Sequence, residues 1–339
     1  MSTYRALQLQ RFAPTVRAAT EVVSLPWRDP APGEIAVRNL CCGVNGIFDT
    51  QIARNAVDYV RVALPSVMGV EALGVVQAVG ADVEGFVPGD AVVTVRFRGG
   101  YREGNIGPAA DFIPVAAATP EWLALASTGV SAWLALNHLG QAQAGETVAI
   151  SAAAGGLGHL LVQLAKLRGC RVVAICGGPV KAAFVKSLGA DRVIDYRAEP
   201  IGTALARDFG DALDLAIDTV GGSTFDALLD NLAPHGRLVV GGAAQDLDGK
   251  PEIVTGPRIV HKLYYKGASV RGFMNGLLTP HWAAARAALF PLYQAGQLRV
   301  ALDAQRFCGV AQVPDAVEHL LSGQSMGKVV VELGQETHA

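Results

Sequence analysis

The sequence of 339 residues has few charges and no excess of either sign. Only 17% of the residues are charged, and 28 basic residues are balanced by 30 acidic ones, which gives a formal net charge of −2. A protein that binds nucleic acid concentrates its basic residues on one surface, whereas these lysines and arginines are scattered along the chain. We therefore expect neither nucleic acid nor an anionic membrane as a partner.

Long apolar runs are absent as well. No apolar stretch reaches the roughly 18 residues that a membrane-spanning helix needs, and residues 1–12 lack the apolar centre of a secretory signal. The sequence predicts no membrane span, and the cytoplasm is the expected location.

Cysteine is scarce in the sequence. The five cysteines are Cys41, Cys42, Cys170, Cys176 and Cys308. Their number is odd and no Cys-x-x-Cys pair occurs, although a disulfide framework or a zinc knuckle would need paired spacings. We interpret all five as buried, reduced thiols.

The chain is long enough for two domains, and its pattern of apolar residues changes near Pro120. Before that point, short apolar runs alternate with Gly and Pro, which is typical of β-structure. After it, strands and helices alternate, and this order predicts a parallel sheet with helices on both faces. Predicted strands lie at 34–37, 72–79, 91–95, 147–152, 171–175, 193–195, 213–218, 237–240, 269–273 and 328–333, and predicted helices at 157–167, 179–188, 224–232, 281–295 and 314–321.

A glycine-rich turn follows the strand at 147–152 and opens the next helix. Its sequence over 151–158 is Ser-Ala-Ala-Ala-Gly-Gly-Leu-Gly, with Ala153 where the dinucleotide-binding pattern has its first glycine. Gly155 would let the backbone approach a pyrophosphate, and Gly158 would let the helix pack closely on the strand. The turn therefore predicts a dinucleotide site that includes Ala154, Gly155, Gly156 and Leu157.

The end of the second strand of this unit indicates which dinucleotide binds. Sites for NAD place an acidic residue there to bind the ribose 2′-hydroxyl, but the strand ends here in Gly177 and Gly178, with Lys181 beyond. The missing acid and the nearby cation favour a 2′-phosphate and hence NADPH. Alone, Lys181 would be read as an ordinary surface lysine.

Ordered motifs along nearly the whole chain resemble those of one family. They are Gly43-Val44-Asn45 with Asp49, residues 68–74, 87–90, 128–132, 151–158 and 162–166, residues 186–191 and 218–222, Val270-Arg271-Gly272-Phe273 and Gly327-Lys328-Val329-Val330. The sequence resembles the medium-chain dehydrogenase/reductase superfamily. Within it, the chain is similar to the zinc-independent quinone oxidoreductases and the prostaglandin-reductase-like enoyl reductases.

The resemblance implies an α/β fold in two domains with the active site in the cleft between them. Residues 128–274 would form a Rossmann domain, a doubly wound parallel sheet that binds NADPH. Residues 1–127 and 275–339 would form a β-rich, GroES-like catalytic domain. The resemblance also implies a homodimer in which the strand near 269–273 pairs across a two-fold axis.

The same resemblance assigns roles to particular residues. Asn45 and Thr128 would flank the nicotinamide, and Lys181 and Tyr196 would hold the 2′-phosphate beside Gly177. The backbone at Ala243 and Phe273 and the side chain of Lys328 would line the rest of the cofactor groove.

The sequence departs from the zinc-dependent relatives at their metal ligands. Cys42 stands at the place of the first ligand, but Val70 replaces the histidine beside Glu71, and no later cysteine precedes the Rossmann domain. These residues do not supply the three protein ligands that catalytic zinc needs. We predict no metal, and without a Lewis acid the favoured chemistry is hydride addition to an activated alkene.

Such a reaction needs a group that donates to the developing enolate oxygen and a source of a proton. Tyr59 lies at the spacing at which enoyl-reducing relatives carry a tyrosine, so we assign Tyr59 and Asn45 as catalytic candidates; a packing role for Tyr59 remains an alternative. The predicted substrate is a small unsaturated carbonyl compound. A quinone reductase and a non-catalytic cofactor-binding protein are the alternative functions.

An extra segment, residues 96–102, contains three arginines and the glycine pair Gly99-Gly100. A guanidinium clamp for a substrate carboxylate is one interpretation, and a solvated insertion is the other.

Overall fold

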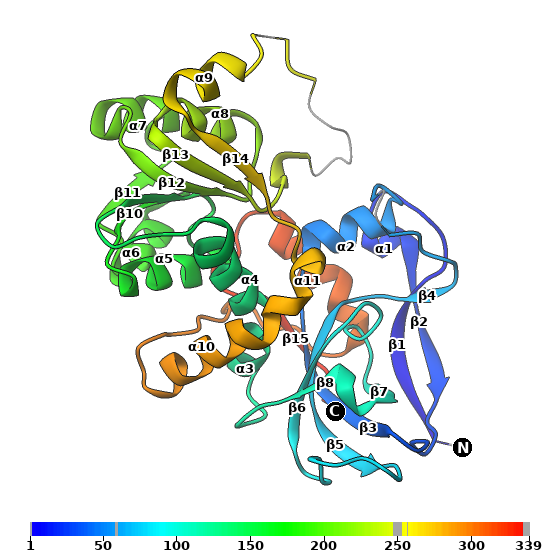
Figure 1. Ribbon diagram of the computed structural model, residues 1–339. Helices are drawn as coiled ribbons and strands as arrows, with labels where there is room; N and C mark the ends of the chain where they lie inside the picture. Colours follow the sequence, from blue (N-terminus) through cyan, green and yellow to red (C-terminus); the bar gives the residue numbers. More distant parts are fainter. Residues whose placement is uncertain (1, 58–59, 247–252, 256, 335–339) are drawn as a thin grey trace. The chain divides into compact units, whose positions relative to one another are not determined.

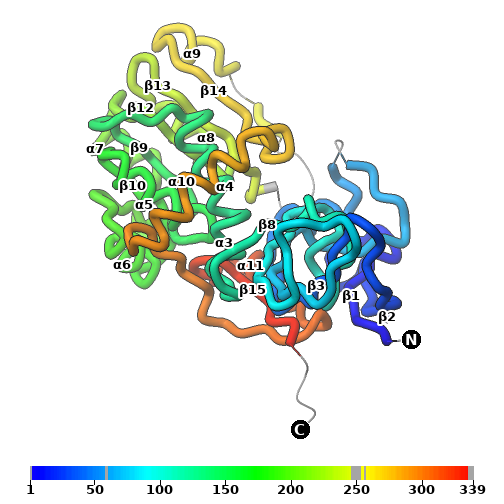
Figure 2. Tube along the Cα trace, turned by 60° about the horizontal axis from the view of Figure 1, so that its bottom comes forward, coloured from blue at the N-terminus to red at the C-terminus, as the bar shows by residue number. Residues whose placement is uncertain are grey.

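The computed structural model describes the chain except for residues 1, 58–59, 247–252, 256 and 335–339. The chain divides into two compact units. Unit 1 comprises Met1–Ser127 and Leu302–Ala339, and unit 2 comprises Thr128–Ala301. The first division lies between residues 127 and 128, as in the sequence analysis, whereas the second lies after residue 301 instead of residue 274. Helix α10 (Trp282–Gln294) accounts for the difference, because it runs alongside α4 (Val130–Trp133) of unit 2 (Figure 2).

Unit 2 contains a six-stranded sheet in which every neighbouring pair is parallel. Its order is β11-β10-β9-β12-β13-β14, which is the 3-2-1-4-5-6 order of a dinucleotide-binding sheet. The predicted Rossmann fold is therefore confirmed. The strands are β9 (Thr147–Ile150), β10 (Arg171–Cys176), β11 (Arg192–Asp195), β12 (Leu213–Asp218), β13 (Leu232–Val240) and β14 (Ser269–Gly272).

Helices cover both faces of this sheet. Helices α5 and α6 pack on one face, and α7 and α8 pack on the other (Figure 1). The strands between them are continuous apolar runs because both faces are buried. The helices of unit 2, besides α4 and α10, are α5 (Gly158–Leu167), α6 (Pro179–Ser187), α7 (Ile201–Phe209), α8 (Gly222–Asp230) and α9 (Val260–Lys266), with η3 (Leu134–Leu139), η4 (Ala244–Asp246) and η5 (Asn275–His281).

Unit 1 contains two antiparallel sheets. The larger one has the order β15-β3-β5-β6-β8 with β7 also paired to β3, and the smaller one has the order β2-β1-β4. The strands are β1 (Thr3–Leu9), β2 (Thr20–Pro26), β3 (Glu34–Gly43), β4 (Ser66–Val67), β5 (Glu71–Val79), β6 (Ala91–Val95), β7 (Gly104–Pro108), β8 (Phe112–Pro114) and β15 (Val330–Glu332). The pairing of β15 with β3 brings Lys328, near the end of the chain, beside Val44. The predicted β-rich domain is confirmed.

Short helices pack against these sheets. They are α1 (Val16–Ala19), α2 (Gly46–Ala53), α3 (Pro120–Ala124) and α11 (Val313–Leu321), with η1 (Ala109–Asp111) and η6 (Val310–Gln312), while the π-helix η2 (Leu125–Gly129) spans the division between the units. The sequence analysis missed α2 because its buried face mixes Gly46, Asp49 and Thr50 with apolar residues and shows no clear helical period. It also missed α7, a short amphipathic helix.

The burial of the cysteines and the length of the apolar helices can be compared with what the sequence predicted. Four of the cysteines are buried and reduced, but the expectation was wrong for Cys308, which is exposed. Within the described residues, no helix is both long enough and apolar enough to cross a membrane.

Candidate functional site

The carboxyl ends of β9 and β12 are organised around one buried carboxylate, Asp218. Its Oδ1 accepts a hydrogen bond from Ser151 Oγ at 2.6 Å and one from the N–H of Val220 at 3.0 Å, and its Oδ2 accepts the N–H of Gly221 at 3.0 Å. Ser151 Oγ in turn accepts the N–H of Thr219 at 2.9 Å. The chain turns in opposite directions after these two strands, which is where this fold binds ligands. The sequence analysis did not recognise this role of Asp218.

The glycine-rich turn lies directly beside this point. A Cβ on Gly158 would lie 2.6 Å from Ala153 Cα, so only glycine lets α5 begin this close to β9. A Cβ on Gly155 would meet only one atom within 4 Å, and the backbone there is therefore approachable. No acceptor among the described residues binds the N–H groups of Gly156 and Leu157. Such N–H groups at a helix start can bind a phosphate.

His159 fastens this turn to the segment that ends unit 2. Its ring is fully buried, and its Nε2 accepts the N–H of Ala301 at 3.1 Å. Nδ1 then carries the proton and donates to Gly155 O at 2.9 Å. Gln163, one turn further along α5, bonds to both the N–H and the C=O of Arg299. Sequence reasoning had no signal for these contacts, because the partners are distant in sequence.

The end of β10 has space only for glycine. A Cβ on Gly177 would lie 2.5 Å from Tyr196 Oη, so the missing side chain makes room for the tyrosine ring. Gly178 has a φ of +89° and donates its N–H to Asp195 Oδ1 at 2.8 Å. This bond and a second one from the N–H of Arg197 lower the pKa of Asp195 below its usual value.

Arg197 is a candidate that the sequence analysis missed. Its Nη1 lies 3.5 Å from where a Cβ on Gly178 would stand, and no ion pair in the described part of the chain engages its guanidinium. The signal was available, since a basic residue directly follows Tyr196.

Ala243 and Phe273 belong to the same carboxyl edge of the sheet. Ala243 lies against Gly221, and Phe273 donates its N–H to Val240 O at 2.8 Å. The structure thus brings the predicted residues 154–157, Gly177, Tyr196, Ala243 and Phe273 to one edge of the sheet. Thr128 lies elsewhere in unit 2, in the π-helix η2.

Unit 1 holds a second group of predicted residues around a buried ion pair. Lys328 Nζ lies 2.5 Å from Glu71 Oε1, and the two side chains are 4% and 0% exposed. The same ammonium donates to Val44 O at 3.1 Å and to Asn45 Oδ1 at 3.2 Å, so its three N–H bonds are all used. The predicted contact of Lys328 with a cofactor stays a prediction.

The ion pair fixes the orientation of the Asn45 amide. Its Oδ1 faces the ammonium of Lys328, and its Nδ2 donates to Glu71 Oε1 at 2.9 Å. The second hydrogen on Nδ2 is not engaged by any described residue, and the side chain is partly exposed. Asn45 can therefore present an N–H donor, and not a carbonyl, to a ligand. The other catalytic candidate, Tyr59, lies outside the described residues.

Asp49 and Tyr101 lie beside this cluster. Both are buried, and the hydroxyl of Tyr101 donates to Asp49 Oδ2, which also accepts the N–H of Asn45 at 3.1 Å. Burial raises the pKa of Asp49 to about 7, while the hydrogen bond from Tyr101 opposes the rise. Burial likewise holds the pKa of the Cys42 thiol well above its usual value.

The residues at the place of the zinc site do not form a metal-binding set. Cys42 is a buried thiol that burial keeps protonated, Val70 offers no ligand atom, and Glu71 already has the ammonium of Lys328 as its counter-ion. No group of three or more His, Cys, Asp and Glu side chains suited to a metal occurs in the described part of the chain. Independence from zinc stays a prediction.

The arginine-rich segment is largely engaged within unit 1. Arg96 forms an ion pair with Asp111, and Arg102 donates to Tyr4 Oη and to Gly104 O. Arg98 is exposed and lies over the ring of Phe97. The carboxylate clamp of three arginines is not supported, because two of the three already have partners.

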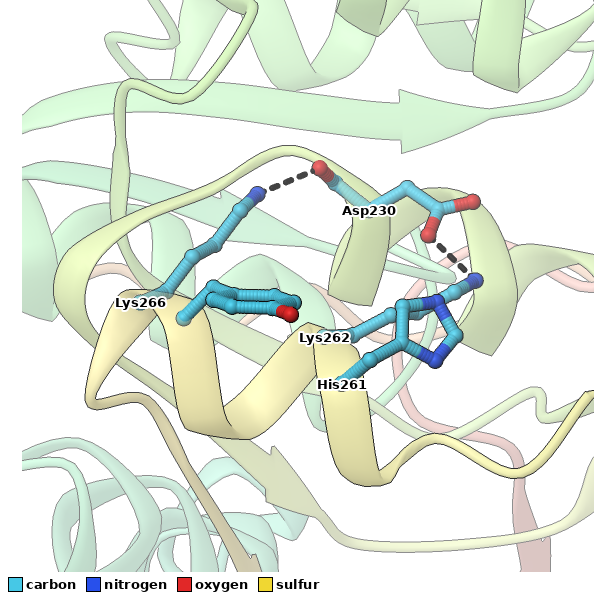
Figure 3. Close-up of a pocket in the computed structure, with 5 residues that line it drawn as sticks. Asp230, His261, Lys262 and Lys266 are labelled. Atoms are coloured by element: carbon cyan, nitrogen blue, oxygen red, sulfur yellow. Dashed lines mark hydrogen bonds and ion pairs between the residues drawn. The ribbon is translucent and has the colours of Figure 1, made fainter.

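A hollow of about 240 Å³ lies between α8 and α9 (Figure 3). Its charged side chains are already engaged: Asp230 forms an ion pair with Lys262, and Lys266 Nζ pairs with Asp211 and donates to the backbone oxygen of Asp230 at 2.7 Å. These contacts attach α9 to α8. We therefore assign the hollow a structural role.

Comparison with known proteins was made at the level of both sequence and structure. Residues 31–116 match the alcohol dehydrogenase GroES-like domain, and residues 156–290 match the zinc-binding dehydrogenase family. The chain is 34% identical to prostaglandin reductase-3 of Mus musculus over 98% of its own length and 90% of the relative's. It is 33% identical to a probable quinone oxidoreductase of Leishmania amazonensis, with 98% of each chain covered.

A solved structure gives the same result. Escherichia coli quinone oxidoreductase, complexed with NADPH, superimposes with a TM-score of 0.83 at 26% identity, and the match covers 97% of this chain and 99% of that one. Two families of domain, relatives above 30% identity over nearly the full length, and a shared fold agree. The chain belongs to the medium-chain dehydrogenase/reductase superfamily, in the zinc-independent branch of the quinone oxidoreductases and prostaglandin reductases.

Proposed function

We propose that this protein uses NADPH to reduce the carbon–carbon double bond of a small α,β-unsaturated carbonyl compound. The coarser activity, that of an NADPH-dependent oxidoreductase, follows from its family and from relatives that were solved with NADPH. The observation that carries the finer proposal is the Asn45 amide, held by Glu71 and Lys328 so that one N–H remains available.

The residues of unit 2 fit NADPH. Gly155 leaves the backbone approachable, and the N–H groups of Gly156 and Leu157 suit its pyrophosphate. The Tyr196 ring occupies the space that a side chain at Gly177 would fill, and Lys181 and Arg197 would be the cations for the 2′-phosphate. Thr128, Ala154, Ala243 and Phe273 would line the remainder of the groove. When bound, NADPH supplies the hydride.

The residues of unit 1 would act on the substrate. Addition of hydride to the β-carbon places negative charge on the carbonyl oxygen, and the Asn45 N–H would stabilise that enolate by donating to it. Tyr59 would donate to the same oxygen or return a proton to the α-carbon. A conjugated substrate spreads the developing charge over several atoms, so neutral donors can suffice where an isolated carbonyl would call for a metal.

The proposal also includes a homodimer. Strand β14 is the edge of the six-stranded sheet, and an unpaired edge can add a strand from a second copy. The neighbouring helix α9 exposes Tyr264, which is 79% accessible. Both features support pairing across β14.

The reaction is tested by following a label. With NADPH that carries deuterium at the transferred position, a simple enone is expected to give the saturated ketone with deuterium on its β-carbon. With unlabelled NADPH in deuterated water, the deuterium should instead appear on the α-carbon, because the proton added there comes from a group that exchanges with the solvent. Mass spectrometry and NMR of the product check both. Oxidation of NADPH by quinones alone, with no labelled alkane-type product from enones, enals or enoyl thioesters, would favour the quinone reductase.

Cofactor preference is tested at the end of β10. Lys181→Ala should weaken NADPH binding roughly 10- to 150-fold and leave NADH almost unchanged, because a hydrogen bond to a charged group contributes about 1.5–3 kcal/mol. Arg197→Ala should act in the same direction. Titration calorimetry with both cofactors measures the effect, and Lys186→Ala on the same helix is the matched control, since its ammonium bonds to Asp191 O. Equal use of both cofactors by the wild type would contradict the assignment.

Catalysis by Tyr59 is tested by removing its hydroxyl. Loss of one oxyanion donor typically lowers kcat about 10²- to 10³-fold, so Tyr59→Phe should lower kcat on an enone by one to three orders of magnitude. NADPH affinity should change little. Tyr4→Phe, which removes a hydroxyl that bonds to Arg102, is the control. An unchanged kcat would leave proton delivery to water.

The dimer is tested by light scattering of the purified protein across a range of concentrations. We expect a mass twice the 35.3 kDa of one chain, independent of concentration in the micromolar range. A mass of one chain throughout that range would rule out the proposed pairing.

A further inference from the structure

The segment 96–102 is fixed to helix α2 through two aromatic side chains. The ring of Phe97 packs edge-on against Phe48 with 6.5 Å between ring centroids, and the hydroxyl of Tyr101 donates to Asp49. Phe48 and Asp49 are neighbours on α2. The extra segment therefore holds the helix that follows Asn45.

The position of Tyr101 is closely defined. Its N–H donates to Met68 O at 3.0 Å and its C=O accepts from Leu7 N at 2.8 Å. A Cβ on Gly69, whose φ is +83°, would lie 2.6 Å from Tyr101 N, and a Cβ on Gly100 would lie 2.7 Å from Gly69 C. Two glycines thus make room for a ring that is 0% exposed. A side chain seated in this way cannot move to find another partner.

The hydroxyl of Tyr101 begins a short chain of hydrogen bonds that ends at the Asn45 backbone. Asp49 Oδ2 accepts from Tyr101 Oη and from the N–H of Asn45 at 3.1 Å, while the N–H of Asp49 donates to Asn45 O at 3.0 Å. An ionised Asp49 accepts both bonds more strongly than a neutral carboxyl would, because a hydrogen bond to a charged acceptor is stronger than one to a neutral acceptor. The backbone of Asn45 is held from this side, and its amide is held by Glu71 and Lys328 from the other.

We propose that Tyr101 and Asp49 are positioning residues for Asn45: the Tyr101 hydroxyl fixes the Asp49 carboxylate, and that carboxylate holds the start of α2. This inference rests on the proposed function, because it assigns the two residues to the orientation of the Asn45 donor. It also gives the extra segment a role other than substrate binding: it carries Tyr101 into the core of unit 1.

The charges around Asp49 set the expected pH dependence. Burial raises its pKa to about 7; the Tyr101 hydroxyl, the Asn45 N–H and the Lys328 ammonium oppose the rise, and Glu71 adds to it. The buried thiol of Cys42 also faces this group. Activity should therefore fall as the pH drops through about 7. Stability should show the opposite sign, because a carboxyl whose pKa is raised by folding contributes most at low pH and least above 7.

The experiment compares the pH profiles of kcat for full-length variants between pH 5.5 and 9.5. Tyr101→Phe should move the acid limb upward by roughly one to two pH units, since a hydrogen bond to a charged group contributes about that much to a pKa. At pH 7 its kcat should be lowered about 5- to 50-fold, with recovery above pH 9. Asp49→Asn should keep kcat low and remove the limb altogether.

The matched control is Tyr4→Phe, which also removes a bonded hydroxyl from unit 1 and should leave the limb in place. An acid limb unmoved by Tyr101→Phe, with only a lowered melting temperature, overturns the proposal. If Tyr101→Phe does not fold, the wild type decides: a flat profile between pH 5.5 and 8.5, or a limb that survives in Asp49→Asn, also overturns it. Should enones fail as substrates, the same profiles are measured with a quinone, so that the two proposals fail separately.

Discussion

The buried ion pair between Lys328 and Glu71 is the constraint on which unit 1 depends. Both side chains are almost entirely removed from water, where a lone charge would cost several kcal/mol. The two residues are far apart in the sequence, and the pairing of β15 with β3 brings Lys328 to Glu71. Glu71 Oε2 has no hydrogen-bond partner in the described residues, and the carboxylate therefore depends on the single oxygen shared by Lys328 and Asn45. The pairing of β15 with β3 therefore also determines the orientation of the Asn45 amide.

The fold could be predicted from the sequence because its signals are local. Strands buried on both faces read as continuous apolar runs, and Gly155 and Gly158 sit where a strand passes into a helix. The strand order then follows from the known chirality and sequence of such units. The position of the second division between the units was harder to predict, because it depends on the contact of α10 with α4, which joins residues about 150 positions apart. Helix α2 was missed for a related reason: its buried face carries Asp49 and Thr50, whose partners come from other elements.

Candidate residues of the site could be named from the sequence, whereas the groups that support the site could not. Residues that match a motif, such as Asn45, Gly177 and Tyr196, could be named in advance. The supporting roles of His159, Asp218 and Tyr101 could not be named, because each depends on a long-range hydrogen bond that leaves no periodicity in the sequence. Arg96 and Arg102 show the converse limit, since the sequence left open whether these arginines bind a substrate, and their partners Asp111 and Tyr4 decide against it. A spacing identifies a residue type that suits a reaction, and only the packing determines whether that group is already engaged.

The absence of the zinc ligands and the presence of the Lys328 ammonium are linked by the charge of Glu71. With Val70 in place of a histidine, Glu71 would be a buried carboxylate without a cation, and Lys328 supplies the charge that balances it. The cost is that all three N–H bonds of the ammonium are used, so it cannot itself polarise a substrate. The donor left available in this cluster is the remaining N–H of Asn45, a neutral group whose amide is held by two charged side chains. A neutral donor stabilises an oxyanion less than a metal does. It therefore suits substrates whose developing charge is already delocalised, and conjugation between an alkene and a carbonyl provides that delocalisation.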